Sequence, residues 1–533
     1  MYMLREKFIR FAVFAMAGIW LVTTATASLA QERGGSLILL VHPEPTTLAS
    51  YSHSGATTTI AATKVYDGLL EYDRELRPMP SLATEWSTSD DGLSMTFKLK
   101  KGVKWHDGKP FTSADVQYSI MEGVRKLHPR GATVFAVVDS IETPDQYTAV
   151  FKLSKPAPAL IQTFASDETP MIPRHLFEGT DVATNPLNNA PVGTGPFMFK
   201  EWVKGSHIVF ERNPNYWRDG FPYLDNVVLR FIADAGTRVL ALEKGEVHAS
   251  INDAVPNEEV RRLDGLDHLE VVRKGHVAYG PILLLEINNR RPPLDQINVR
   301  KALAHAIDRQ FVIDKIWFGD GVIATGPIPE TQAAFYTDDV YKYDFNPEKA
   351  RNLLDEAGLK PDANGVRFEI THDMLPFGGA WQRLGEYLKE ALGDVGIKVT
   401  LRQQDFPTFL RRVYTDNDFD LTSTWFISLA DPTMGVQRIY WGKNIKKGVG
   451  FSNGSGYSNP IVDDLWERAA VETNPATRAE LYEELQRIIV DEIPVVWMME
   501  RRLAIVKNTR VQDLIMTAQG LRDGLYRTWM LKE

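Results

Sequence analysis

One five-residue stretch has the residue types of a nucleophilic catalytic site. Residues 450–454 (Gly-Phe-Ser-Asn-Gly) match the G-x-S-x-G pattern, in which a serine attacks a carbonyl carbon from a sharp turn between a strand and a helix. Residues 443–448 before it are largely polar and basic, and residues 455–460 after it carry Ser, Gly, Asn and Pro. We therefore predict a loop on both sides and expect no nucleophile at Ser452.

Other patterns of catalysis and cofactor binding are incomplete or missing. The run Gly193-Thr194-Gly195 lacks the third glycine of the dinucleotide-binding fingerprint. The sequence has no G-x-x-x-x-G-K-[ST] loop, and its eleven histidines form no H-x-x-x-H or H-E-x-x-H pair. It has no cysteine, which excludes disulfides, thiolate ligands and a cysteine nucleophile. We expect no catalytic residue, metal or cofactor; an exported hydrolase with an unrecognised site is the alternative.

A ligand-binding wall is a stronger hypothesis. Trp425 lies in the largely apolar run 421–430, which ends at Asp431 and Pro432. A strand that ends in an aromatic residue, small polar groups and Asp-Pro is typical of a pocket wall. Burial in the core is the alternative for this tryptophan.

The patterns around these residues predict a mixture of strands and amphipathic helices. Alternating apolar and polar residues predict strands at 95–100 and 397–401, and an apolar run predicts another at 36–41. Capping residues and apolar stripes predict helices that begin at Thr112 and Asn346, and further helices over 381–392 and 481–489. We expect the stripes to pack in the core.

Length and charge narrow the class of protein. A chain of 533 residues is long enough for two to four domains at ~150 residues each. Hydrophobic residues make up 44% and charged residues 24%, as in soluble globular proteins. With 60 Lys and Arg against 69 Asp and Glu, the net charge of −9 excludes a non-specific nucleic-acid binder.

The first thirty residues have the pattern of a cleavable signal peptide. Basic residues precede an uncharged apolar run at 11–22, which is too short to span a membrane, and small residues follow. We predict cleavage after Ala30, at Ser28-Leu29-Ala30, with Ala25-Thr26-Ala27 as the competing site. Residues 1–30 carry three positive charges and one negative, so the mature chain has a net charge of −11. Without cysteine the chain cannot be an acyl-anchored lipoprotein, so we expect it to be free in a Gram-negative periplasm.

A set of motifs spread along the mature chain resembles one family. They resemble the dipeptide- and oligopeptide-type solute-binding proteins of bacterial ABC importers, in the expected order and over essentially the whole mature chain. The matching segments are 65–69, 80–87, 91–100, 103–116, 192–197, 212–217, 299–308 and 346–350.

The resemblance implies a two-lobed α/β fold whose chain crosses between the lobes twice and closes on its ligand by a hinge. The first lobe would take residues 31–280 and 502–533, with an inserted subdomain at about 73–190. The second lobe would take residues 281–501. We expect a monomer that binds a solute in the cleft and docks on a membrane permease.

The residues of this sequence depart from the family's peptide-binding pattern. In peptide binders an aspartate three residues after the tryptophan pairs with the ligand's α-ammonium group. Here the tryptophan is Trp425 but that position is Ser428, and Asp431 is the next acidic residue. The arginine that binds the carboxylate in dipeptide binders maps to about Leu375.

The loop before Leu375 supplies His372 and Asp373 instead. Without an aspartate for its ammonium group and an arginine for its carboxylate, a zwitterionic dipeptide would lose several kcal/mol of binding free energy. We therefore expect a solute other than a simple dipeptide, such as a longer peptide, an opine or a sugar conjugate; misalignment of variable loops is the alternative. Further candidate ligand contacts are Ser54, Gly55, Ala56, Thr57 and Trp497.

Overall fold

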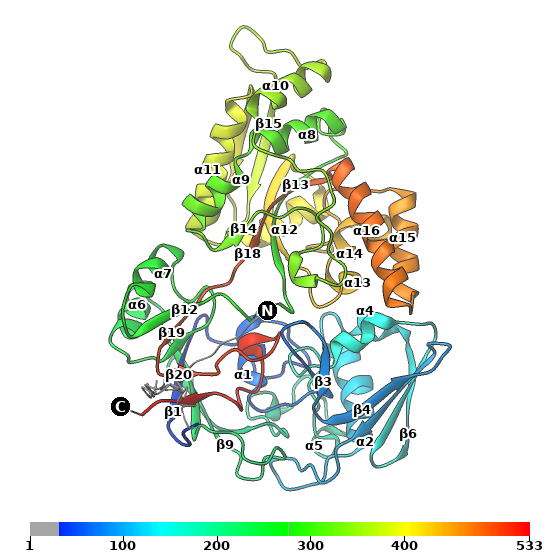
Figure 1. Ribbon diagram of the computed structural model, residues 1–533, viewed down its shortest axis with the longest axis vertical. Coiled ribbons are helices and arrows are strands. Elements are labelled where there is room, and N and C mark those ends of the chain that lie inside the picture. Colours follow the sequence, from blue (N-terminus) through cyan, green and yellow to red (C-terminus); the bar gives the residue numbers. More distant parts are fainter. Residues whose placement is uncertain (1–30, 276, 533) are drawn as a thin grey trace, which may run out of the picture.

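The computed structural model describes residues 31–275 and 277–532; the predicted signal peptide, 1–30, lies outside the described residues. The chain forms two α/β lobes, the second above the first in Figure 1. A seven-stranded sheet lies in the first lobe and a six-stranded sheet in the second. The predicted α/β fold of two lobes is confirmed.

The main sheet of the first lobe joins segments from both ends of the chain. β1 runs parallel to its neighbours β10 and β11, and the other pairs are antiparallel. In pairing order the strands are β12 (Leu269–Val272), β19 (Ile505–Asn508), β11 (Ala249–Ser250), β1 (Ser36–Val41), β10 (Asn226–Phe231), β9 (His207–Arg212) and β8 (Phe197–Val203). Its longer helices are α1 (Ala56–Ala62), α6 (Ala235–Glu243) and α7 (Asn257–Asp264).

A four-stranded antiparallel sheet forms a further part of the first lobe. Its core includes Phe97, Phe151 and Phe164, whose ring centroids lie 4.9–5.4 Å apart. In pairing order the strands are β4 (Ala83–Thr88), β5 (Ser94–Leu99), β7 (Thr148–Leu153) and β6 (Val138–Asp145). Shorter elements nearby are β2 (Leu70–Tyr72), β3 (Pro78–Pro80), α2 (Ser113–Tyr118), α3 (Arg125–Leu127), α4 (Gly131–Val134) and α5 (Arg174–Phe177).

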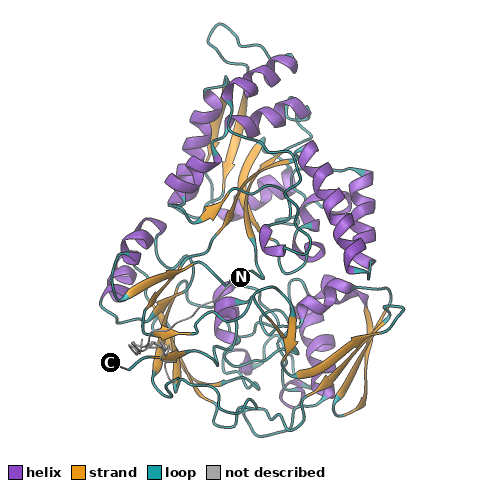
Figure 2. Ribbon diagram, in the orientation of Figure 1, coloured by secondary structure: helices purple, strands orange, loops and turns teal. Residues whose placement is uncertain are grey.

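The second lobe is a six-stranded sheet flanked by helices (Figure 2). Its central strand β13 is buried along its whole length. In pairing order the strands are β14 (Gly321–Val322), β18 (Val495–Arg501), β13 (Pro281–Ile287), β17 (Leu421–Ile427), β15 (Phe368–Met374) and β16 (Ile397–Arg402). The helices are α8 (Ile297–Ala306), α9 (Arg309–Phe311), α10 (Pro347–Glu356), α11 (Gly379–Gly393), α12 (Phe406–Arg411), α13 (Pro432–Gly435), α14 (Gln437–Tyr440), α15 (Pro460–Val471) and α16 (Pro475–Glu492).

The chain passes between the two sheets twice. It leaves the first sheet at the end of β12 and enters the second at Pro281, and it leaves β18 at Arg501 and rejoins the first sheet at Ile505. A two-stranded sheet of β20 (Val511–Gln512) and β21 (Trp529–Met530) lies near the C-terminus. We propose that the lobes hinge at these two crossings, with the limits 31–280, 281–501 and 502–533.

Side chains of the two lobes also contact each other beside the crossings. Arg501 pairs with Asp253 at 2.7 Å, and Arg273 pairs with Asp320 at 2.8 Å. Each pair joins one lobe to the other. The lobes are therefore in contact in this structure.

Local sequence signals placed several elements correctly. The strands at 36–41, 95–100 and 397–401 are confirmed, apart from their end residues. Thr112 and Asp115 form the predicted capping box of α2, and Asn346 caps α10 through the N–H of Lys349. No helix of the described residues is long and apolar enough to cross a membrane.

The two glycine-containing motifs are structural. Ser452 lies in a loop, as predicted, and its hydroxyl donates to the Val449 carbonyl at 2.7 Å. Gly195 donates its N–H to the Val65 carbonyl at 2.8 Å, and a Cβ at Gly193 or Gly195 would lie within 3 Å of that backbone. The Gly193-Thr194-Gly195 run thus lets two backbone segments approach closely.

Candidate functional site

A small cavity of about 10 Å³, room for about one water molecule, lies where the two lobes meet the first crossing. It is lined from both lobes and from the crossing itself. The first lobe contributes Gln162, Asp167, Glu168 and Gln519, the crossing contributes Ala278 and Tyr279, and the second lobe contributes Leu429, Ala430 and Met434.

Tyr279 connects the lobes at this cavity. Its hydroxyl donates a hydrogen bond to Asp167 Oδ2, and its carbonyl accepts from the backbone N–H of Ser428 at 2.9 Å. The guanidinium of Arg522 lies 3.7 Å from the centre of the Tyr279 ring, within the range of a cation–π contact. The next residue, Gly280, has φ of +42°, and a Cβ there would lie 2.8 Å from the Thr331 hydroxyl. Glycine is therefore required beside Tyr279.

The neighbouring carboxylates Asp167 and Glu168 have different environments. Oε2 of Glu168 accepts hydrogen bonds from Nη2 and Nε of Arg130 at 2.7 and 3.2 Å. The charge of Arg130 overcomes the effect of burial and lowers the pKa of Glu168. Asp167 is 2% exposed, and its Oδ1 has no hydrogen-bond partner among the described residues. Burial, and next the Glu168 charge, raise the pKa of Asp167 to about 7.

Gln162 supplies a second acceptor at the same cavity. Its amide nitrogen donates to the Leu76 carbonyl at 3.2 Å, whereas its Oε1 has no partner among the residues described. Buried polar atoms in folded proteins are almost always hydrogen-bonded. Two unpaired acceptors on one cavity, from Gln162 and Asp167, therefore favour a ligand group rich in N–H donors.

Arg438 is a half-buried cation on the second lobe. Its Nε donates to the Gly435 carbonyl at 3.1 Å, and its guanidinium lies 5.3 Å from the centre of the Phe426 ring. Among the described residues no carboxylate lies within ion-pair distance of it. Burial, and next the charge of Arg130 on the first lobe, lower its pKa to about 10. Arg438 is thus a candidate anion site that the sequence did not single out.

Ser428 and Asp431, both predicted to contact ligand, have partners within the protein. The Ser428 hydroxyl donates to the Tyr279 carbonyl at 3.2 Å, in addition to its backbone bond. Asp431 caps α13 through the N–H of Thr433, and its two oxygens accept from Arg478 at 2.7 and 2.9 Å. Both carboxylate oxygens are therefore occupied by a buried arginine, which leaves Asp431 poorly placed to receive a ligand ammonium.

His372 and Asp373 point into networks of the second lobe. Nε2 of His372 lies 3.0 Å from the Ser423 hydroxyl, and burial lowers the pKa of His372 to about 3, so the ring is neutral. Oδ1 of Asp373 accepts from Gln404 at 2.8 Å, and Arg402 pairs with its other oxygen. Neither residue is among the described residues that line the interlobe cavity.

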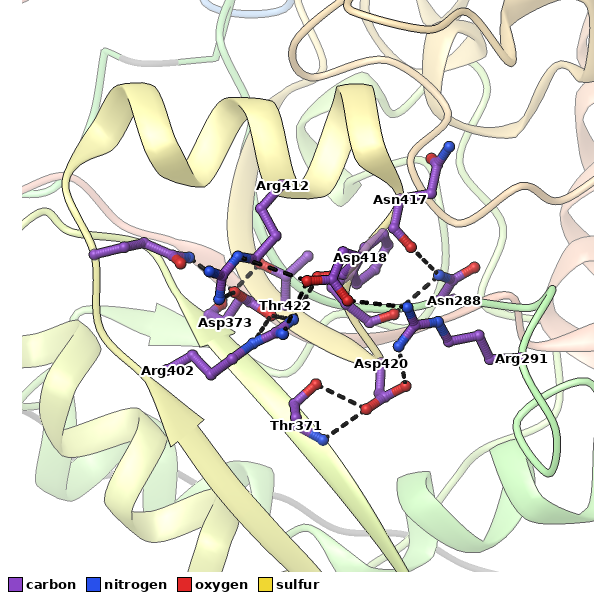
Figure 3. Close-up of polar contacts among 12 residues, drawn as sticks. Asn288, Arg291, Thr371, Asp373, Arg402, Arg412, Asn417, Asp418, Asp420 and Thr422 are labelled. Atoms are coloured by element: carbon purple, nitrogen blue, oxygen red, sulfur yellow. Dashed lines mark hydrogen bonds and ion pairs between the residues drawn. The ribbon is translucent and has the colours of Figure 1, made fainter.

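Asp373 belongs to a larger set of alternating charges at one edge of the second sheet (Figure 3). Arg291 pairs with Asp418 and Asp420 at 3.1 and 3.0 Å, and Asp420 also accepts two bonds of 2.7 Å from Thr371. Charges of both signs meet here. The network is explained by structure alone, because each carboxylate has a basic partner.

The remaining predicted residues lie in three separate places. Trp497 is buried, and its Nε1 donates to the Tyr440 hydroxyl at 2.9 Å. Trp425 is half-buried on β17, where it pairs with Leu283 and packs at the edge of the core. The segment Ser54, Gly55, Ala56 and Thr57 forms the start of α1, with Gly55 as its N-cap.

The start of α1 lies near the acidic pair. His53, directly before Ser54, is close enough to His128 for its charge to lower that pKa, and Glu168 is close enough to raise it. Burial is the main cause that brings the pKa of His128 to about 4. The 54–57 segment thus lies in the neighbourhood of the cavity, as Ser428 and Asp431 also do, and its ligand contacts stay a prediction.

The arrangement is suited to binding. Polar groups of the first lobe and the crossing face apolar residues of the second lobe across a cavity beside the chain crossing, as in proteins that enclose a solute by closing a hinge. The described residues contain no group of three His, Cys, Asp or Glu that could hold a metal ion. Fold and site together define a two-lobed solute-binding protein.

Comparison with known proteins identifies the family. Residues 77–447 match the model of the bacterial extracellular solute-binding proteins, family 5 (middle part). The chain belongs to this family. It is 31% identical over 440 residues to the probable D,D-dipeptide-binding periplasmic protein DdpA of Escherichia coli, which covers 81% of each chain.

Two solved structures have the same fold. The ABC transporter substrate-binding protein CtaP of Listeria monocytogenes superposes with a TM-score of 0.82 at 26% identity, covering 94% of this chain and 100% of that one. The binding protein AgaA of A. tumefaciens R10, in complex with agropinic acid, superposes with a TM-score of 0.75 at 27% identity, covering 94% and 99%.

Proposed function

We propose that this protein is the substrate-binding component of an ABC import system. It captures a peptide or peptide-like solute in the periplasm and delivers it to a membrane permease. The observation that carries the proposal is the cavity at the first crossing, lined by residues of both lobes. Family membership and the likeness to CtaP support it.

A non-peptide polar solute is the second candidate. It is favoured by the position after Trp425, where Ser428 binds the Tyr279 backbone and supplies no charge for an α-ammonium group. The likeness to AgaA supports an opine, whereas the likeness to DdpA supports a peptide. Both solute classes carry the carboxylates that Arg438 could bind.

Localisation follows from the N-terminal pattern. A signal peptide cleaved after Ala30 would export the chain, whose sequence offers no cysteine for acyl attachment. We propose a monomer that diffuses in the periplasm between its solute and its permease.

Native mass spectrometry of the protein purified from the periplasm tests this function. The expected result is a mass excess of one bound peptide or peptide-like solute that is released on denaturation. A hydrolysis assay against the same solute is expected to show no turnover. Turnover would contradict the proposed binding function and support the exported-hydrolase alternative.

Replacing Trp425 by Ala tests the predicted pocket wall. If Trp425 contacts the solute, its loss weakens affinity about tenfold or more, because buried aromatic contacts carry over ~1 kcal/mol. Calorimetry with the released solute measures the change. Trp441→Ala is the matched control, since Trp441 is also half-buried at the edge of the same core. If Trp425→Ala binds the solute as tightly as Trp441→Ala does, Trp425 packs in the core and does not contact the solute.

A further inference from the structure

We propose that Asp167 is the recognition residue for a protonated amino group of the solute, an inference that rests on the proposed function. It assigns the amino end of the ligand to the first lobe. In the family pattern that end is held by an aspartate of the second lobe, at the position of Ser428.

The free acceptors at the cavity select an N–H donor. Asp167 is buried and lines the cavity, with Oδ2 bonded to Tyr279 and Oδ1 unpaired among the described residues. The unpaired Oε1 of Gln162 lines the same cavity. An ammonium group has three donors and can satisfy both oxygens. A ligand carboxylate would instead be repelled by ionised Asp167 and find no donor on Gln162 Oε1.

Of the two neighbouring carboxylates, Asp167 is the one without an ion-pair partner among the described residues. Glu168 is already paired with Arg130. Arg522 lies over the Tyr279 ring and acts on Asp167 only at longer range. The other titratable or charged groups near this cluster are His53 and His128 on the first lobe and Arg438 on the second.

The second lobe then supplies the opposite charge. Arg438 has no carboxylate partner in the part of the chain described, and its charge acts on Arg130 across the lobes. An ammonium at Asp167 and a carboxylate near Arg438 would place the two ends of a zwitterion on different lobes. Closure of the lobes would therefore be favoured by such a solute. This arrangement departs from the expectation from sequence that zwitterionic dipeptides bind poorly, and the experiment below distinguishes the two.

Affinity for an ammonium should depend on pH because only ionised Asp167 attracts it. The pKa of Asp167 in the free protein is raised to about 7, and a bound ammonium would lower it. Lowering the pH through 7 protonates Asp167 and weakens binding. With a peptide α-amino pKa of ~8, affinity should fall about sixfold from pH 7.5 to pH 6.

The experiment compares free and N-acetylated peptides. Mature wild-type protein is titrated with mixtures of di- and tripeptides of Ala, each in both forms, by native mass spectrometry and then by calorimetry. We expect the free forms to bind about 30-fold more tightly than the acetylated forms. We also expect the affinity for the free forms to fall with pH as stated above.

Asp167→Asn is expected to bind free and acetylated forms with equal, weak affinity. The control Asp139→Asn, an exposed change on β6 of the first lobe, should keep the wild-type preference. Equal affinity of the wild type for both forms would overturn the inference and leave the proposed function standing. Binding of neither form would contradict the inference and the proposed peptide function together. The wild-type comparison decides the question even if Asp167→Asn fails to fold.

Discussion

Replacing Arg478 by Met is expected to lower the free energy of unfolding by about 3–5 kcal/mol, because it leaves the Asp431 carboxylate buried without its counter-charge. The Arg478 and Asp431 side chains are only 6% and 2% exposed, and the arginine donates to both carboxylate oxygens. Arg478 also donates to the Ala469 carbonyl at 2.8 Å and to the Tyr482 hydroxyl at 3.1 Å. The substitution therefore removes a hydrogen-bond donor from acceptors on Asp431, α15 and α16.

Urea unfolding monitored by tryptophan fluorescence measures this loss. Arg468→Met is the matched control, since Arg468 pairs with Asp464 at 3.3 Å in a solvent-exposed position. Exposed pairs contribute ~0–1 kcal/mol, so the control should change little. Equal effects of the two substitutions would show that the Asp431–Arg478 pair does not stabilise the fold.

The same substitution should also weaken solute binding. Asp431 ends a short loop, residues 428–431, whose Leu429 and Ala430 line the interlobe cavity. Its anchor on α16 is Arg478. A folded fraction of Arg478→Met is therefore expected to bind the solute more weakly than wild type, although Arg478 itself is not among the lining residues.

Replacing Gly435 by Ala is expected to cost about 3 kcal/mol or more, because overpacking against rigid backbone cannot be relieved by a rotamer change. A Cβ at this position would lie 2.7 Å from the Ile427 carbonyl oxygen and closer still to the Ser428 carbonyl. Gly435 ends α13, which follows the cavity-lining loop. The clash would push α13 away from the end of β17.

Gly393→Ala controls for the general effect of a glycine substitution. Gly393 is the last residue of α11, and a Cβ there would meet nothing within 4 Å. Alanine has the higher helix propensity, so this change should be neutral or stabilising by up to ~1 kcal/mol. Thermal unfolding compares the two variants with wild type. A Gly435→Ala protein as stable as the control would contradict the close packing of α13 on β17.

Many of the secondary-structure elements could be predicted from short stretches of the sequence. The alternating residues of β5 and β16, the capping box of α2 and the Asn346 cap of α10 depend on neighbours a few residues away. The loop at Ser452 could be predicted for the same reason. The motifs shared with the family then added the two-lobed architecture.

The residues of the candidate site were harder to predict from the sequence. Whether a buried charge has an ion-pair partner depends on residues that are distant in the chain. Asp431 stands next to Pro432 as in the family pattern, yet Arg478, 47 residues away, occupies it. Asp167 lies in no motif that the sequence singled out. Its place at the cavity depends on a hydrogen bond from Tyr279, which lies 112 residues further along the chain.

The sequence by itself determined the secondary-structure periodicity, the charge pattern of the first thirty residues, the lack of cysteine chemistry and the family. Those features depend on residue type and on short spacings. Tertiary structure alone decided which carboxylates remain without a counter-charge. Asp431 and Asp373 gained arginine partners during packing, whereas Asp167 kept an unpaired oxygen beside the crossing. The electrostatics of a buried group depend on every element packed against it, and those elements are far apart in the chain.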